Sequence, residues 1–178
     1  MRVRRASRIR KNLPGARRYG ISQRATRHPA GCQSHSWTGA LIKTAEDIYE
    51  VIVNTVPGAK FAVAFCEASG PSLIRVEAND DELRRSAISN AEAIGAGHVF
   101  VLLIRDAYPI NILGRVRDCF EVCSIFCATA NAVEAIVADS GHGRGVLGVI
   151  DGNSPKGVET AEHAAQRHEF VRKIGYKL

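Results

Sequence analysis

The first 45 residues of this 178-residue chain contain no aspartate or glutamate. Residues 1–40 carry ten lysines and arginines, a formal charge of +10. Residues 41–178 carry 14 basic and all 18 acidic residues, a formal charge of −4. The overall charge of +6 is therefore the sum of two unlike segments. Because the larger segment is mildly acidic, we do not infer a nucleic-acid partner from the basic balance.

Long hydrophobic runs are also absent. No apolar segment approaches the roughly 20 residues needed to cross a bilayer, and the hydrophobic share of 46% is ordinary for a globular protein. The length fits one domain with a sizeable core. We therefore expect a cytoplasmic protein with no membrane partner.

Neither a disulfide framework nor a zinc site is indicated by the five cysteines. Four of them lie in or next to apolar segments, which predicts buried free thiols in a reducing compartment. The spacing of four between Cys119, Cys123 and Cys127 places them on one face of the strand expected there. No familiar zinc spacing lies nearby, so no structural metal is expected. The remaining two cysteines are Cys32 and Cys66.

The basic residues 1–40 show no sustained period of 2 or 3.6 and few large apolar residues. Three interpretations fit this composition. An arginine-rich, acid-free N-terminus is typical of an organelle transit peptide. Clustered arginines can form a nucleic-acid-binding arm, and the simplest alternative is a disordered tail.

Residues 41–178 show regular helix and strand signals. Acidic residues in a first turn, Gly and Pro breaks and apolar runs set the expected boundaries. Helices are expected over Thr44–Asn54, with Thr44 at the N-cap, over Asn79–Ile94, with Asn79–Glu82 as the cap, and over Pro109–Val116 and Glu159–Ile174. Strands are expected over Lys60–Cys66, Ser72–Val76, His98–Ile104, Val122–Ala128, Val133–Ala138 and Val146–Ile150. Strands and helices alternate at first and strands cluster later, which predicts a single compact α/β domain with helices packed on a mixed sheet, or an α+β variant.

Polar residues gather at the strand ends and in glycine-rich junctions. Strand-end loops commonly carry ligand-binding groups, but Asn, Asp, Ser and Gly are also ordinary turn formers. A histidine that opens a strand can be a base, a phosphate contact or a buried hydrogen-bonding group. The residues concerned are Glu67, Ser69, His98, Arg105, Asp106, Asn111, Thr129, Asn131, Arg144, Asp151, Ser154 and Lys156.

Familiar nucleotide and hydrolase motifs do not explain these residues. Residues 143–148 match G-x-G-x-x-G, but they lead into an expected strand rather than a helix, which excludes a dinucleotide fingerprint. The chain has neither a P-loop nor a G-x-S-x-G nucleophile elbow.

Taken together, several segments resemble the adenosine-specific kinase family of compact α/β proteins. They are KTAEDIYE, PGAKFAVAFCEASG, IGAGHVFVLLIRDAYPIN, CFEVCSIFCATAN, GRGVLGVIDGNSPKGVE and FVRKIGYKL. They follow the family's order and cover residues 41–178 almost without a gap.

The resemblance implies adenosine or AMP recognition, phosphoryl transfer through a phosphohistidine, ATP with Mg²⁺, and a homo-oligomer, expected to be a trimer. The alternative is an oligomeric AMP- or adenosine-binding module without turnover. Carried onto this chain, the catalytic candidates are His98 and Asp106. The nucleotide-binding candidates are Lys43, Glu67, Ser69, Asn111, Thr129, Asn131 and Asp151. Amide side chains can pair with an adenine edge. Carboxylates can hold ribose hydroxyls or Mg²⁺, and an ammonium group can neutralise phosphate.

One departure from the family pattern is informative. The family has G-Q-(small)-H-(aromatic) before Ile42-Lys43-Thr44, whereas this chain has Trp37-Thr38-Gly39-Ala40-Leu41. With suitable wobble bases, the codons of this stretch read one base later encode Gly-Gln-Ala-His. We therefore hypothesise that residues 1–40 are an out-of-frame reading. In that case the domain lacks its first strand and the histidine expected to be phosphorylated.

Overall fold

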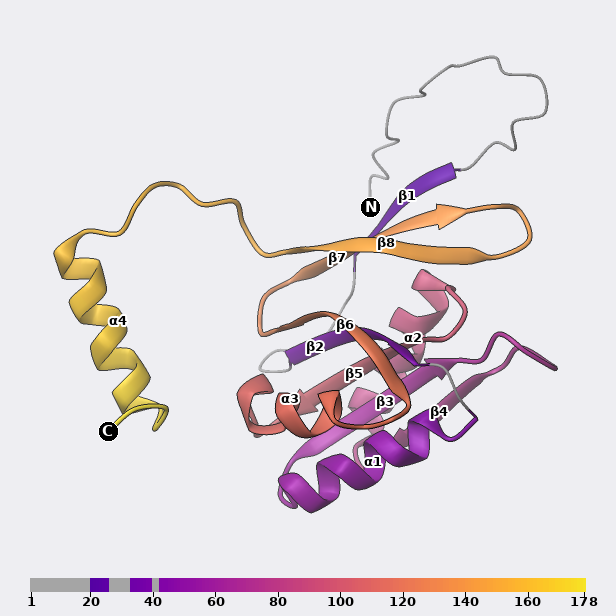
Figure 1. Ribbon diagram of the computed structural model, residues 1–178, viewed down its shortest axis with the longest axis horizontal. Coiled ribbons are helices and arrows are strands. Elements are labelled where there is room, and N and C mark those ends of the chain that lie inside the picture. Colours follow the sequence, from indigo (N-terminus) through magenta and orange to yellow (C-terminus); the bar gives the residue numbers. More distant parts are fainter. Residues whose placement is uncertain (1–19, 26–32, 40–41) are drawn as a thin grey trace, which may run out of the picture.

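The computed structural model describes residues 20–25, 33–39 and 42–178. These residues form one mixed helix-and-strand domain (Figure 1). The strands are β1 (Gly20–Ala25), β2 (Gln33–Gly39), β3 (Lys60–Cys66), β4 (Ile74–Ala78), β5 (Val99–Arg105), β6 (Val122–Thr129), β7 (Val133–Asp139) and β8 (Arg144–Asp151). The helices are α1 (Thr44–Thr55), α2 (Asp81–Ile94), α3 (Pro109–Arg117) and α4 (Ala161–Lys173).

Two sheets organise the domain. The larger has the order β4-β3-β5-β2-β6 and the smaller has the order β1-β7-β8. Every pairing between these named strands is antiparallel. The expectation of helices packed on a sheet is confirmed, and the antiparallel pairings give the α+β variant of it.

Both faces of the larger sheet are covered, which explains why its central strands are apolar at nearly every position. Successive side chains of a strand point to opposite faces. Ala62 and Ala64 of β3 therefore pack on the α2 side, whereas Phe61, Val63 and Phe65 pack on the side of α1 and α3. Strand β5 divides in the same way between the two clusters.

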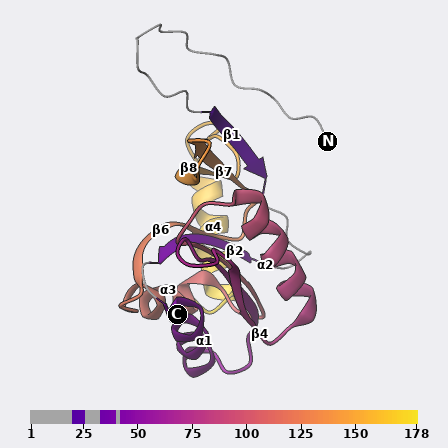
Figure 2. The same ribbon diagram turned by 90° about the vertical axis from the view of Figure 1, so that its right-hand side faces the viewer.

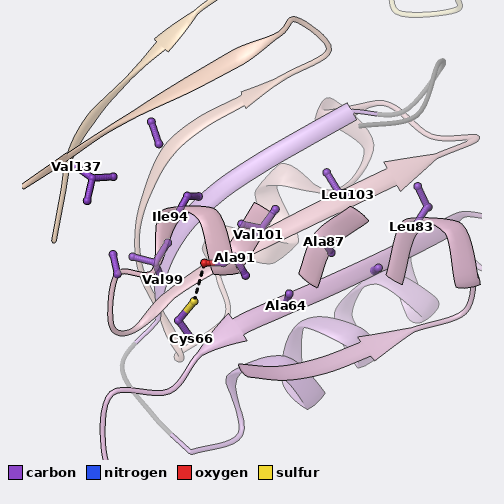
Figure 3. Close-up of a cluster of buried hydrophobic side chains, with 13 residues drawn as sticks. Ala64, Cys66, Leu83, Ala87, Ala91, Ile94, Val99, Val101, Leu103 and Val137 are labelled. Carbon is purple, nitrogen blue, oxygen red and sulfur yellow. Dashed lines mark hydrogen bonds between the residues drawn. The ribbon is translucent and has the colours of Figure 1, made fainter. Parts of the chain in front are cut away.

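Figure 3 shows the cluster on the α2 side, where Leu83, Ala87 and Ala91 of the helix meet the sheet. The small residues of β3 let α2 approach closely. Within this cluster the Cys66 thiol donates to the carbonyl oxygen of Ala91 at 3.7 Å, and burial raises the pKa of this thiol to about 11. Cys66 is therefore a protonated structural thiol at neutral pH.

Helix α2 has the termini that its sequence predicts. The side chain of Asp80 accepts a hydrogen bond from the backbone N–H of Leu83 at 2.9 Å. Gly95 ends the helix with φ +59°, a left-handed conformation that glycine adopts at little cost. These caps position the Gly95–Gly97 turn, which leads directly to β5.

The smaller sheet lies at one end of the molecule, next to the C-terminal end of α2 (Figure 2). Ala135 and Val137 of β7 are buried and join the α2 cluster. The turn between β7 and β8 comes close to the end of α2, because Ala96 and Arg144 form an isolated bridge.

Helix α4 has no buried residue, although it is 13 residues long. Figure 1 shows it set apart from the body of the fold, at the end of an extended segment. A ring contact between Tyr108 and Tyr176, with centroids 5.6 Å apart, ties the segment after α4 to the start of α3. Phe170 of α4 is 57% exposed.

Some local expectations need correction. Lys43, not Thr44, is the N-cap of α1, and Thr44 is buried in the first helical position. Cys119 precedes β6 rather than lying in it, so the three cysteines do not share one strand face. Among the described cysteines only Cys66 is buried, whereas Cys119 and Cys127 are half-buried and Cys123 is exposed. Cys32 lies outside the described residues.

Residues 1–40 contribute two described strands, so the chain as written does have a strand before α1. The backbone of β2 pairs with β5 on one side and β6 on the other. Backbone pairing does not require particular side chains, so it does not decide whether this segment is an out-of-frame reading. That origin, and the transit-peptide, arm and tail interpretations, stay hypotheses.

Candidate functional site

Glu67, immediately after β3, is the centre of the most highly connected polar cluster in the described chain. Its Oε1 accepts hydrogen bonds from the backbone N–H groups of Ala68 and Ser69 at 2.9 and 3.0 Å, and from the Ser69 hydroxyl at 2.6 Å. Its Oε2 lies 2.9 Å from a guanidinium nitrogen of Arg75. The side chain of Glu67 is only 6% exposed, and these hydrogen bonds and the arginine offset the cost of burying its negative charge.

These contacts lower the pKa of Glu67 to about 2. The hydrogen bond from the Ser69 side chain is the largest cause, followed by the Ser69 backbone N–H. Donors aimed at a carboxylate stabilise its charged form more than its neutral form. Glu67 is therefore a fixed negative charge at neutral pH rather than a proton donor.

His98, immediately before β5, is held beside Glu67 in a strained conformation. Its φ of 55° is in the left-handed region that non-glycine residues rarely adopt. Its backbone N–H donates to the carbonyl of Cys66 at 2.7 Å, and its Nε2 lies 3.2 Å from Glu67 Oε1. The ring also stacks against Phe65, with centroids 6.0 Å apart. Such a strained backbone conformation persists only where many surrounding contacts hold it in place. Strained residues of this kind are concentrated at functional sites.

Arg75 on β4 completes the cluster and was missed by the sequence reasoning. Its guanidinium bonds both to Glu67 and to the backbone carbonyl of Ile42. It therefore joins β4 to the segment that enters α1, next to Lys43. The sequence indicated only that Arg75 lies in a short strand. That pattern does not distinguish an arginine with a role in the site from an ordinary arginine on an edge strand.

A pocket of about 500 Å³ opens beside this cluster. The segment after β3 contributes Glu67, Ala68 and Ser72, and the turn after α2 contributes Gly95 and Gly97. The end of β7, the β7–β8 turn and the start of β8 supply the other lining residues. A Cβ on Gly97 would lie 2.7 Å from the Cβ of Ala68. Glycine is therefore required for the α2–β5 turn to pack against the loop that holds Glu67.

Lys43 lies at the same end of the larger sheet, at the start of α1. Its Nζ is 2.6 Å from Asp47 and 3.8 Å from Glu121, and the hydrogen bond to Asp47 is the main reason that its pKa is raised. The buried carboxylate of Glu121 accepts from the Thr44 hydroxyl at 3.3 Å. A second pocket, of about 760 Å³, lies next to Lys43 between α1 and the segment after α3.

The strand registers divide the predicted site residues between the two ends of the larger sheet. The pairings Thr38↔Val99 and Gly39↔Val122 mark one end, where β3 also finishes. The pairings Gln33↔Ile104 and Ser34↔Thr129 mark the other. The first end carries Lys43, Glu67, Ser69 and His98; the second carries Asp106, Asn111, Thr129, Asn131 and Asp151.

The residues at the second end have local structural partners. Asn131 Nδ2 donates to Asp151 at 2.9 Å, and the Asn131 backbone N–H donates to Thr129 Oγ1 at 3.1 Å. Asn111 accepts from the Tyr108 backbone N–H at 2.8 Å, which caps α3. Asp106 has φ 63°. A single chain therefore does not place these residues beside His98, and their functional roles stay predictions.

The arrangement does not indicate a resident metal. Among residues 20–25, 33–39 and 42–178 there is no group of three His, Cys, Asp or Glu side chains placed to hold an ion. Glu67 Oε1 already accepts several hydrogen bonds, which makes it a poor Mg²⁺ ligand. Mg²⁺ is usually bound by one or two carboxylates together with substrate phosphates, so it fits this site only as part of a nucleotide substrate.

The fold and the site together define a small α+β protein with a preorganised carboxylate–histidine pair next to an open pocket. The family model described as "Adenosine specific kinase" matches residues 29–177. The chain therefore belongs to the adenosine-specific kinase family. The match begins before residue 41 and includes β2.

A solved structure agrees with this assignment. The crystal structure of the PH1918 protein from Pyrococcus horikoshii OT3 is 40% identical to this chain, with a TM-score of 0.86. The alignment covers 90% of this chain and 99% of that one. No curated protein matches the chain. In the described part of the chain, none of the helices has both the length and the apolar character that crossing a bilayer demands.

Proposed function

We propose that this protein binds adenosine or AMP and transfers a phosphoryl group from ATP through a phosphohistidine. The observation that carries this proposal is the His98–Glu67 pair, because a histidine held in a strained backbone conformation beside a carboxylate that is ionised at neutral pH is preorganised for chemistry. Family membership supports the adenosine-related substrate.

The geometry favours one histidine nitrogen as the nucleophile. Glu67 stays ionised, so it favours a proton on His98 Nε2 and leaves the lone pair on Nδ1. Nδ1 attacks the γ-phosphorus of Mg·ATP, and the bond from that phosphorus to the bridging oxygen breaks, so ADP leaves with the electron pair. The 5′-hydroxyl of adenosine then attacks the phosphorus. The P–N bond breaks, its electron pair returns to Nδ1, and the hydroxyl proton is released to water.

Incubation with γ-labelled ATP tests this proposal. We expect protein-bound phosphate that is labile in acid and stable in base, and its loss when adenosine is added. His98→Gln should abolish the label, and His168→Gln, an exposed histidine on α4, should retain it. Labelling that survives in His98→Gln would assign the chemistry to another residue.

A binding module without turnover is the second candidate. It is favoured by the sequence before Ile42, because Ala40 occupies the position where the family pattern has the histidine. This candidate predicts calorimetric binding of adenosine or AMP with no labelled protein and no AMP formed from adenosine.

We also propose a homo-oligomer, specifically a trimer, with α4 packed against a neighbouring copy. An isolated helix of 13 residues is marginal in water, and α4 buries none of its side chains against its own chain. Such an assembly would also allow the polar residues at the second end of the sheet, including Asp106, to approach a neighbour's site. Light scattering after size-exclusion chromatography measures the mass directly.

A further inference from the structure

The pocket beside Glu67 has a second wall, formed by the β7–β8 turn, that the proposed chemistry does not use. Ser140, His142 and Arg144 line this wall. The volume of about 500 Å³ is within the range of small-molecule sites, about 300–1,000 Å³. Most of the lining residues are Gly, Ala or Ser, so a ligand can approach the backbone closely.

The side chain of Arg144 is held by Asp139 and lies against Gly95. Its Nε donates to Asp139 Oδ2 at 3.0 Å, across the β7–β8 turn. Its Nη1 lies 2.9 Å from the point where a Cβ on Gly95 would be, so the glycine makes room for the guanidinium. Asp139 engages only Nε in this contact, and the terminal nitrogens of Arg144 remain as donors at the pocket wall.

Although Asp139 pairs with its Nε, the terminal nitrogens of Arg144 are cationic donors at the pocket wall that an anionic ligand group can use. The other charged side chain that lines the pocket is Glu67, which is already compensated by Arg75, His98 and the donors of Ala68 and Ser69. A guanidinium fork matches the oxygens of a phosphate group in both spacing and charge.

We propose that Arg144 binds the phosphate of a nucleoside monophosphate in this pocket and so makes the site prefer AMP to adenosine. The inference rests on the proposed nucleotide-binding function and adds the group that recognises the phosphate. The competing role is structural, because a cation near the C-terminal end of α2 is favourable by itself and would help the hairpin to dock there.

Calorimetry with AMP and with adenosine separates these roles. For Arg144→Gln we expect AMP affinity to fall about tenfold or more, as for a lost hydrogen bond to a charged group, and adenosine affinity to change less than about twofold. Arg85→Gln is the matched control, because Arg85 is exposed on α2 and does not line the pocket. This control should leave both affinities unchanged.

Arg144→Lys is the second variant, because it keeps the charge and removes the fork. It should show a smaller but selective loss of AMP affinity, and it keeps the test usable if Arg144→Gln does not fold. Equal losses for AMP and adenosine, or no loss for AMP, would overturn the inference in either variant. If the unsubstituted protein binds neither ligand, the proposed function itself fails; if it binds AMP and both variants match it, only the role of Arg144 fails.

Discussion

His98 Nε2 lies 3.2 Å from Glu67 Oε1, and a 2.7 Å hydrogen bond joins the His98 backbone N–H to the carbonyl of Cys66, the residue before Glu67. The side-chain pair is therefore fixed by the antiparallel β3–β5 pairing as well as by its own contact. Residues 31 positions apart in the sequence are held together by the sheet, and this gives the cluster its rigidity.

Stability should depend on Glu67 at acidic pH. Its folded-state pKa is about 2, below the ordinary value of 4.5, so its contribution is fully present above pH 4.5. Between about pH 4.5 and pH 2 the unfolded state binds more protons, and the contribution is progressively lost as pH falls. Urea unfolding across this range should show a steeper loss for the unsubstituted protein than for Glu67→Gln. Parallel pH profiles would contradict the assignment.

Ser69→Ala should raise the pKa of the Glu67 carboxyl group, because it removes the hydrogen bond from the Ser69 hydroxyl. An NMR titration of the Glu67 carboxyl group measures this pKa.

Backbone strain at His98 should make a β-branched substitution costly. A φ of 55° suits Asn better than Val, because Val crowds its own backbone in this region. We expect His98→Val to be less stable than His98→Asn by about 1–2 kcal/mol. Urea denaturation of the two variants gives the difference. Equal stabilities would mean that His98 does not keep the left-handed conformation in solution.

Gly97→Ala should disturb the site through packing. The added Cβ would lie 2.7 Å from the Cβ of Ala68, so the loop carrying Glu67 must move. Overpacking of this kind costs about 1–3 kcal/mol. Gly58→Ala is the matched control, because no atom lies within 4 Å of its added Cβ. Chemical denaturation and nucleotide titration of both variants should show losses for Gly97→Ala alone.

Restoring the family pattern before Ile42 should increase phosphorylation. Ala40 occupies the position where the pattern has histidine. If a histidine here is the phosphoryl acceptor of the family, Ala40→His should acquire acid-labile phosphate from labelled ATP. Ala40→Gln controls for the change in size and polarity. An Ala40→His protein that labels no more than the unsubstituted chain would argue for His98 as the sole acceptor, or against turnover.

Helix α4 should control the mass of the assembly. Phe170 is 57% exposed on a helix that buries no side chain in its own chain, so a charge there would oppose packing against a neighbour. Phe170→Lys should shift the protein towards a monomer in light scattering. His168→Lys, two residues earlier and on another helix face, should not. A monomeric unsubstituted protein, or a trimer unaffected by Phe170→Lys, would refute this role.

Much of the secondary structure could be predicted from local patterns. The range Lys60–Cys66 was predicted with its observed limits because an uninterrupted apolar segment starts after a Pro-Gly break. The N-terminus of α2 was predicted from the polar residues Asn79–Glu82, of which Asp80 is the N-cap, and its end from the glycines at 95 and 97. The strand near Ile74 was placed two residues early, because a turn and an edge strand have similar polar composition.

The candidate site was only partly predictable. Glu67, Ser69 and His98 stood out because they lie in short glycine-rich junctions at strand ends, and they do meet in space. Arg75 did not, because its role depends on a strand pairing that places it opposite Phe65, two residues before Glu67.

The sequence alone determined where most of the helices and strands after residue 41 lie, because caps, glycine breaks and apolar periods act over a few residues. It also carried the family resemblance and showed the altered motif before Ile42. Only the tertiary structure decided which polar residues share a site, since the antiparallel pairing of β3 with β5 brings Glu67 next to His98, whereas the seven residues of β5 separate His98 from Asp106. Long-range pairing, not local pattern, brings Glu67, Arg75 and His98 together, and it leaves α4 with no buried residue.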